Sequence, residues 1–139
     1  IDGLLLIGFD LKKDIETLLA AYDDQRGITA SFNKNLLSRV NGELGGNFNL
    51  NTFEHVARYN ENKGRIEMHL KSTKEQTVSI NKELFEFLEG ETIHTENCYK
   101  FTKESFTAMS SKAGLSPVKT WTDDKNLFAV MLLRTTSNL

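Results

Sequence analysis

The chain has 139 residues, of which 39% are hydrophobic and 26% are charged, and its 17 Lys and Arg against 19 Asp and Glu leave a formal net charge of −2. This is the length and composition of one globular domain, and it excludes collagenous, low-complexity and disordered chains. Because there is no surplus of basic residues, we expect neither nucleic acid nor an anionic membrane surface as a partner.

Hydropathy and cysteine content narrow the class of protein further. The apolar runs, such as residues 4–7 and 127–133, are far short of the ~20 residues that a membrane-spanning helix needs. Cys98 is the single cysteine, and the three histidines lie scattered without the ligand spacing of a structural zinc site. We therefore expect a soluble protein of a reducing cytoplasm, with no disulfide and no bound metal ion.

The first predicted elements are a strand and a helix. The apolar residues 4–9 follow Asp2 and Gly3 as one continuous run, which is typical of a strand buried on both faces in a parallel sheet. The next apolar side chains recur at helical spacing, at Ile15, Leu18, Leu19 and Tyr22. We interpret no later run as a parallel strand buried on both faces, so we expect the partners of this strand to lie in sequence outside the chain.

Two further helices are predicted downstream. One amphipathic stripe comprises Phe32, Leu36, Leu37, Val40 and Leu44, and it stops at Gly45 and Gly46. Asn51 then stands three positions before Glu54, the arrangement of a capping box. This pattern predicts a short third helix that continues to Ala57.

An antiparallel sheet is predicted to follow. Alternation over residues 65–71 places Ile66, Met68 and Leu70 on one face. Residues 77–80 are predicted to be the hairpin partner of this strand, residues 84–88 are of uncertain type, and residues 92–101 form another strand. In that last strand Glu96 and Cys98 are two positions apart and therefore share a face.

The chain ends in a predicted helix and hairpin. Thr102 is a suitable N-cap for a helix that carries Phe106 and Met109, and Gly114 suits the left-handed position that ends it. Strands at 118–121 and 127–133, joined by the polar turn 123–126, are predicted to complete the fold.

Five stretches resemble one enzyme family when they are taken in this order. They are LLLIGFDLKKD (4–14), AYDD with FNKN (21–24 and 32–35), FEHVA (53–57), RIEMHL (65–70) and GETIHTE (90–96), followed by the hairpin that begins with Trp121. Together they resemble the amino-acid N-methyltransferases that use S-adenosylmethionine, typified by the histidine-specific Nα-methyltransferases of ergothioneine biosynthesis. The resemblance covers nearly the whole chain.

The resemblance implies an α/β protein that is α+β within this chain. It implies the C-terminal part of a Rossmann-like class I methyltransferase fold with an inserted α+β substrate-binding domain. Residues 1–22 and 102–139 would then belong to the methyltransferase domain, and residues 23–101 to the inserted region. The family's glycine-rich cofactor turn has no counterpart here, because Gly45 and Gly46 follow a helix. S-adenosylmethionine is therefore expected to be bound mainly by sequence absent from this chain, and its contacts within the chain stay unknown.

The resemblance also assigns four substrate-binding residues and no catalytic one. Glu96 would contact the substrate imidazole, Tyr22 the α-carboxylate, and Met68 the substrate ring, while Cys98 stands where histidine-specific members carry a small hydroxyl residue. The residue patterns alone also allow simpler roles: Glu96 on a solvated face, Tyr22 completing an apolar helical stripe, Met68 in the core, and Cys98 as a small buried apolar residue. Loop solvation is the simpler role for Asp23 and Asp24, although adjacent carboxylates also suit a cation.

The function expected from these observations is methylation of the α-amino nitrogen of histidine, to trimethylhistidine, by the complete protein. The isolated chain is expected to be inactive and, with an uncovered strand edge, to self-associate. Cys98 leaves open a methyltransferase for another amino acid or amine. A non-catalytic domain that binds a small ligand is the alternative from another functional class.

Overall fold

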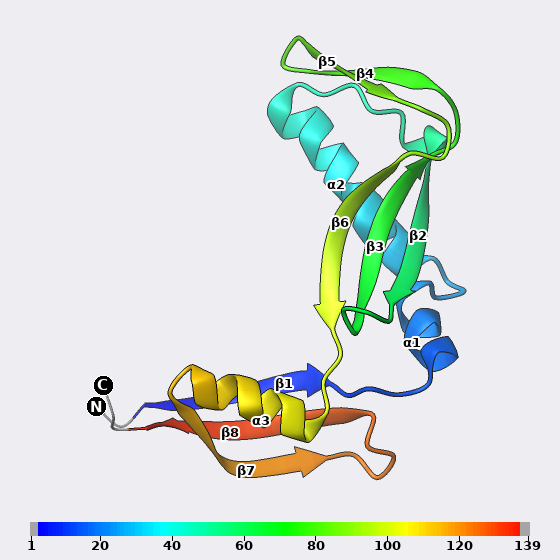
Figure 1. Cartoon of the computed structure of the whole chain (residues 1–139). Helices are drawn as coiled ribbons and strands as arrows, with labels where there is room; N and C mark the ends of the chain where they lie inside the picture. Colours follow the sequence, from blue (N-terminus) through cyan, green and yellow to red (C-terminus); the bar gives the residue numbers. More distant parts are fainter. Residues whose placement is uncertain (1–2, 137–139) are drawn as a thin grey trace. The chain divides into compact units, whose positions relative to one another are not determined.

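A computed structural model describes residues 3–136, which form two compact units. Of the described residues, the first unit comprises 3–14 and 99–136, and the second comprises 15–98. Within the described residues there are three α-helices and three small antiparallel sheets (Figure 1). The α+β content expected for this chain is thus confirmed.

The first unit consists of one sheet and one helix. Its elements are β1 (Leu4–Asp10), α3 (Lys103–Lys112), β7 (Leu115–Thr122) and β8 (Phe128–Thr135), and the strand order is β1-β8-β7. The hairpin and the helix were predicted. Thr102 caps α3 in a reciprocal capping box with Ser105, and Gly114 has a φ of 72° just beyond the helix end, where an L side chain is unfavourable.

Strand β1 differs from its prediction. It pairs antiparallel with β8 instead of lying in a parallel sheet, and its side chains are mostly exposed instead of buried on both faces. The prediction was wrong because a continuous apolar run does not specify strand direction, and β8 is an antiparallel partner within the same chain. Among the described residues, β1 is an edge strand of this sheet.

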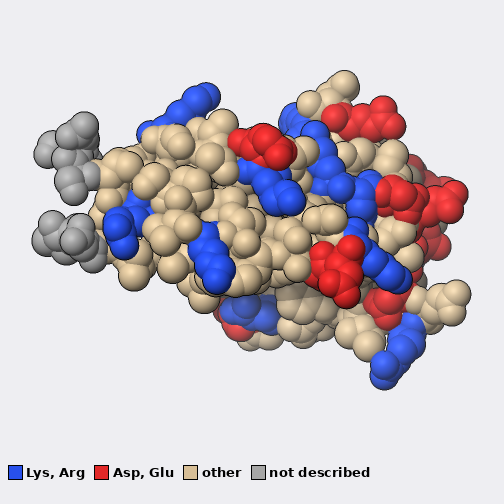
Figure 2. Space-filling model, turned by 90° about the horizontal axis from the view of Figure 1, so that it is seen from below, with Lys and Arg blue, Asp and Glu red and all other residues tan. Residues whose placement is uncertain are grey.

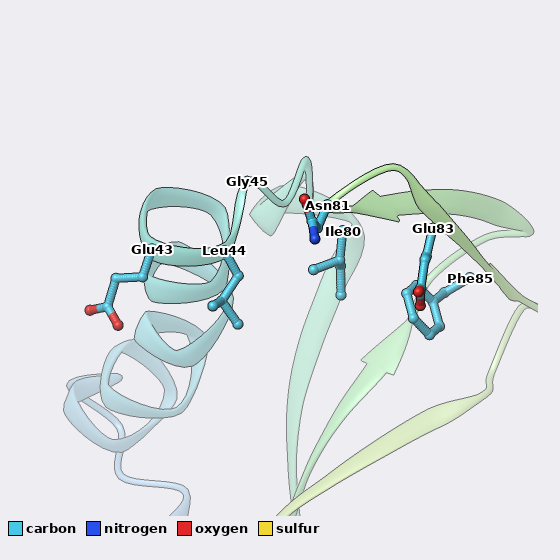
Figure 3. Close-up of a pocket in the computed structure, with 7 residues that line it drawn as sticks. All are labelled: Glu43, Leu44, Gly45, Ile80, Asn81, Glu83 and Phe85. Atoms are coloured by element: carbon cyan, nitrogen blue, oxygen red, sulfur yellow. The ribbon is translucent and has the colours of Figure 1, made fainter.

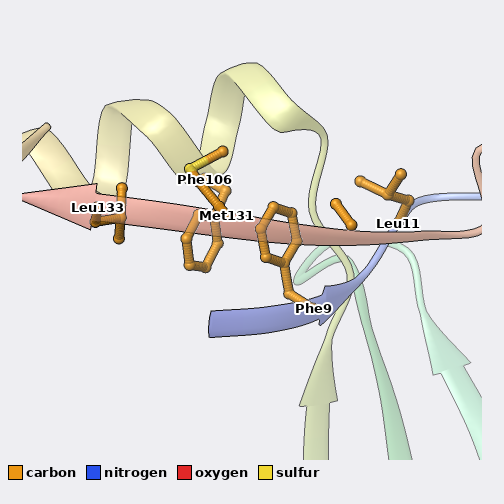
Figure 4. Close-up of a cluster of buried hydrophobic side chains, with 6 residues drawn as sticks. Phe9, Leu11, Phe106, Met131 and Leu133 are labelled. Atoms are coloured by element: carbon orange, nitrogen blue, oxygen red, sulfur yellow. The ribbon is translucent and has the colours of Figure 1, made fainter. Parts of the chain in front are cut away.

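The core of the first unit lies between the sheet and α3 (Figure 4). Phe106 of α3 stacks on Phe9 of β1 with ring centroids 3.9 Å apart, and Met131 and Leu133 of β8 pack beside them. A second feature fixes the end of β1: the ammonium of Lys100, whose side chain is wholly buried, lies 2.8 Å from Asp10 Oδ2. Lys13 contacts the other oxygen of that carboxylate at 2.6 Å. The unit is therefore held by an aromatic core and a partly buried ion cluster.

The second unit contains the remaining elements. Its helices are α1 (Ile15–Tyr22) and α2 (Ile28–Leu44), and a short 3-10 turn follows at Leu50–Thr52. Its strands are β2 (Phe53–Asn60), β3 (Arg65–Ser72), β4 (Gln76–Ile80), β5 (Glu83–Phe87) and β6 (Thr92–Tyr99). The sheet order is β2-β3-β6, with β4 and β5 as a separate hairpin. The two helices fall where the sequence predicts them, and α2 packs on one face of the larger sheet (Figure 1).

Two predictions for this unit were wrong. The third helix is absent: Asn49, not Asn51, caps the 3-10 turn, and the chain then runs as strand β2, where Phe53 is completely buried. Strand β3 pairs with β2 and β6, whereas the predicted partner, β4, pairs with β5. Both errors have one cause, the pairing of β2 with β3. This pairing is set by the tertiary fold, and it overrides the local capping signal at Asn51 and gives β3 a partner other than β4.

The boundaries of the compact units differ from the predicted domain boundaries. Helix α1 groups with α2 and the larger sheet, not with β1, because Leu18 is buried in the second unit and α1 contacts β2 and β3. Charges of both signs are interspersed on the molecular face drawn in Figure 2, with broad uncharged areas between them. Among the described residues, no helix is both long enough and apolar enough to cross a bilayer.

Candidate functional site

The four predicted site residues lie on three elements of the second unit. Tyr22 is the last residue of α1 and is half-buried, Met68 lies on β3 with 3% of its surface exposed, and Glu96 and Cys98 lie on β6. Glu96 is exposed and lines a cavity of about 190 Å³, whereas the other three side chains do not line it. The structure therefore brings Glu96 to a pocket and places Met68 in the core.

Helix α2 and strand β6 form this cavity. The wall from α2 comprises Phe32, Asn33, Asn35, Leu36 and Arg39, and the wall from β6 comprises Thr95 and Glu96. Its volume is below the roughly 300–1,000 Å³ that drug-sized ligands occupy. The space therefore suits a single side chain, such as an imidazole ring, beside one carboxylate.

A buried asparagine connects this cavity to Tyr22. Asn33 has only 3% of its surface exposed, and its amide nitrogen donates to the backbone oxygen of His69 at 3.1 Å and lies 2.9 Å from His55 Nδ1. The other ring nitrogen, His55 Nε2, lies 2.7 Å from the backbone oxygen of Tyr22. Because that oxygen only accepts, Nε2 carries the proton and Nδ1 accepts from Asn33. The network fixes the end of α1 relative to the cavity wall.

A second contact positions the strand that carries Glu96. The hydroxyl of Thr95 donates to the backbone oxygen of Met68 at 3.0 Å, which ties β6 to β3 at the residue before Glu96. Tyr22, Met68 and Glu96 are therefore linked through their neighbours, although their side chains do not share one cavity. Neither Asn33 nor Thr95 was predicted as a site residue. A polar residue in the apolar stripe of α2 was the one available signal for Asn33.

The acidic pair after Tyr22 has a structural role that the sequence left open. Asp24 accepts hydrogen bonds from the backbone amides of Ile28 at 3.1 Å and of Thr29 at 2.8 Å. These bonds satisfy the free amides at the start of α2, since Gly27 offers no side chain to do so. The same bonds lower the pKa of Asp24 to about 2. Asp24 therefore caps the helix that forms the cavity wall.

A larger cavity of about 530 Å³ lies at the other end of α2, between Gly45 and the β4–β5 hairpin (Figure 3). Leu44, Ile80 and Phe85 contribute apolar walls. Glu43 points away from Ile80 and Phe85, and it forms a two-pronged ion pair with Arg39 at 2.9 and 3.0 Å. None of the predicted site residues lies here.

Two of the three histidines, which are scattered in the sequence and lie on different strands, come together in the structure. His69 on β3 and His94 on β6 stack with ring centroids 4.5 Å apart, and Glu67 stands beside them. Sequence spacing does not reveal this cluster, because it depends on β3 pairing with β6 across 25 residues of chain. His55 lies elsewhere and has both ring nitrogens engaged.

Comparison with known proteins decides the family. The sequence matches the family described as "Histidine-specific methyltransferase, SAM-dependent" over residues 1–135. The chain belongs to this family. The family resemblance found in the sequence is thereby confirmed.

Three curated relatives of this chain carry the names of methyltransferases. The histidine N-alpha-methyltransferase of Mycolicibacterium smegmatis is 43% identical over 130 residues, which cover 92% of this chain and 40% of that protein. The enzyme of the same name from Mycobacterium tuberculosis is 40% identical over the same shares. The L-tryptophan methyltransferase of Psilocybe serbica is 29% identical over 94% of this chain and 37% of that protein. The chain thus spans about 40% of the length of the mycobacterial relatives.

Proposed function

We propose that this chain is the C-terminal, substrate-side part of an S-adenosylmethionine-dependent methyltransferase that methylates the α-amino nitrogen of histidine to give trimethylhistidine. The observation that carries the proposal is that Glu96 lines a small cavity of about 190 Å³, within a chain of the histidine-specific family. The 43% identity to a histidine N-alpha-methyltransferase supports the choice of acceptor.

Glu96 supplies the chemistry that selects the acceptor. An ionised carboxylate accepts a hydrogen bond from an imidazole N–H, and such a charge-assisted bond is stronger than a neutral one. An apolar amino acid of similar size leaves this carboxylate without a partner, which costs binding free energy. The neighbouring wall residues Phe32 and Leu36 offer apolar surface to the ring face.

Positioning is the remaining contribution of this chain. Methyl transfer from a sulfonium to an amine is an in-line displacement, so its rate depends on holding a neutral amine in line with the methyl group. In our proposal Tyr22 binds the α-carboxylate through its hydroxyl, and the Asn33–His55 network holds the helix end that carries Tyr22. Met68 and Cys98 do not line the cavity, and the proposal keeps them as substrate-binding residues on the family resemblance alone.

S-adenosylmethionine is the cofactor that the family implies, and the described residues do not fit it. A nucleotide-type site in this fold needs a glycine-rich turn that links a strand to a helix. β1 leads through residues 11–14 to α1, and residues 11–14 contain no glycine. We therefore propose that the cofactor is held mainly by sequence outside this chain. We also propose that β1, α3, β7 and β8 belong to the methyltransferase domain. The enzyme is proposed to act in the cytoplasm.

A second candidate function is methylation of a different amino acid. Cys98 favours it, since a thiol is a weaker hydrogen-bond donor than the hydroxyl expected at this position. A relative that is 29% identical to this chain is named for another acceptor, L-tryptophan.

Methyl transfer by the complete polypeptide to a panel of amino acids tests the proposal. We expect histidine to be the best acceptor and to yield a product three methyl groups heavier by mass spectrometry, and the isolated chain to be inactive. A preference for tryptophan or another amine would replace the first candidate with the second. Methylation by the isolated chain would refute the placement of the cofactor site.

A further inference from the structure

A cluster of potential metal ligands lies on the sheet of the second unit, outside the cavity of Glu96. Glu67 and His69 are two residues apart on β3 and so project from the same face, opposite Met68. Strand β6 lies next to β3 and contributes His94. The ligand atoms of these three side chains all lie within 4.8 Å of one another.

His69 is the residue that points to a missing ligand. Only 7% of its surface is exposed, and within the described part of the chain neither ring nitrogen has a hydrogen-bond partner. Glu67 Oε2 stands 3.5 Å from His69 Nε2, which is too far for a good hydrogen bond. A buried polar group without a partner is costly, so a ligand that binds here removes a penalty that the fold otherwise carries.

Glu67 is held so that one of its oxygens is available. Its Oε1 accepts from Arg65 Nε at 2.8 Å and from Asn60 Nδ2 at 3.0 Å, and Arg65 Nη2 lies 2.6 Å from the same oxygen. Oε2 faces His69 instead. Outer hydrogen bonds of this kind are how proteins orient a metal-binding carboxylate.

We propose that Glu67, His69 and His94 form a binding site for a divalent transition-metal ion of the zinc class. Two imidazole nitrogens and one carboxylate oxygen are a donor set that Zn²⁺ takes in proteins, with a fourth position left for water. Tetrahedral bonds of ~2.0–2.1 Å bring donor atoms to about 3.3 Å from one another. His94 is exposed, and without an ion its Nε2 lies 3.2 Å from the backbone oxygen of Glu96. Binding of an ion therefore requires the His94 ring to turn.

The site joins two strands without sharing residues with the cavity. None of its three ligands lines the cavity of Glu96, so the proposal does not rest on the proposed function. A bound ion links β3 to β6 at His94, two residues before Glu96. Metal binding is therefore expected to raise the thermal unfolding midpoint.

Isothermal titration calorimetry of the untagged full-length protein with ZnCl₂ tests the proposal. We expect saturable binding and, with Co²⁺ as a probe, a visible absorption band of low-symmetry cobalt. His94→Gln and Glu67→Gln should each weaken Zn²⁺ binding roughly tenfold or more, since even outer partners of metal ligands change affinity by that order. Mg²⁺ prefers all-oxygen sites and should not compete.

Glu54→Gln is the matched control, because Glu54 lies on the same face, pairs with Lys71 at 2.9 Å and is outside the cluster. It should leave Zn²⁺ binding unchanged. His94 is exposed, so its variant should keep the circular dichroism spectrum and metal-free unfolding midpoint of the parent. Absence of saturable Zn²⁺ binding by the parent, or equal binding by parent and His94→Gln, would overturn the proposal.

Discussion

Asn33 and Asp24 show that short polar contacts organise the region around the candidate site. Asn33 joins α2 to β3 and to His55, and Asp24 provides the cap that α2 otherwise lacks. Both precede or lie within a helix whose apolar stripe was easy to recognise. The hydrogen-bond partners of Asn33 and Asp24 could not be recognised in the sequence, because a side-chain contact with another element depends on the tertiary fold.

Asp10 is the residue for which the structure makes the sharpest statement about pH. Burial raises the pKa of Asp10, but hydrogen bonds from Lys100 and Lys13 outweigh it and leave the pKa below the ordinary 3.8. A carboxylate whose folded pKa is depressed stabilises the fold above the unfolded pKa, and this stabilisation is lost as the pH falls through the folded value. Asp10 therefore contributes stability at neutral pH that disappears below about pH 3.8.

We predict that Asp10→Asn lowers the free energy of unfolding at pH 7 by roughly 2–3 kcal/mol, because it leaves the buried ammonium of Lys100 without its counter-charge. The loss should shrink as the pH falls below 3.8. Urea denaturation at several pH values measures it. Asp124→Asn, in the exposed turn between β7 and β8, is the control. An equal loss at all pH values would contradict this electrostatic account.

At the scale of elements, local patterns predicted three of four helices correctly and strand pairing poorly. The stripes of α1, α2 and α3 follow from the 3.6-residue period, and Gly45 and Gly114 end two of these helices with positive φ. β3 was recognised by its alternation, but its partners were not, since pairing across tens of residues is not encoded in any single segment. Glu96 came from family resemblance, and nothing in the alternation of β6 by itself singled it out.

Two glycines of α2 give a matched test of how this helix ends. Gly42 lies inside the helix with open space around its missing side chain, whereas Gly45 adopts a φ of 64° at the C-terminal end. Gly42→Ala should raise the free energy of unfolding by about 0.5–1 kcal/mol. Gly45→Ala should lower it by about 1–2 kcal/mol, because an L side chain is strained at positive φ. Equal effects of the two changes in urea denaturation would refute this helix boundary.

At the scale of the whole molecule, the two units have separate hydrophobic cores and carry different surface features. The second unit carries the cavity of Glu96 and the Glu67–His69–His94 cluster, and the first unit presents an edge strand with exposed apolar residues. Leu4 and Leu6 share one face of β1 and are 62% and 63% exposed. Apolar side chains on an edge strand favour association with another chain.

We therefore predict that this chain self-associates by itself, and that the double change Leu4→Lys with Leu6→Lys shifts it toward the monomer. Sedimentation velocity over a range of concentrations measures the effect. Leu84→Lys is the control, since Leu84 is similarly exposed at 71% but lies on β5 in the other unit. A monomer at every concentration, or an equal shift in the control, would contradict the prediction.

The central claim is that Glu96 recognises the imidazole of a histidine acceptor. Calorimetric titration of the complete polypeptide with histidine, with and without S-adenosylhomocysteine, tests it most directly when Glu96→Gln is compared with the parent. Gln keeps the size of Glu and removes its charge, so we expect histidine affinity to fall about tenfold or more, the cost of roughly 1.4 kcal/mol or greater for a lost charge-assisted bond. Equal histidine affinity in parent and variant would contradict the account.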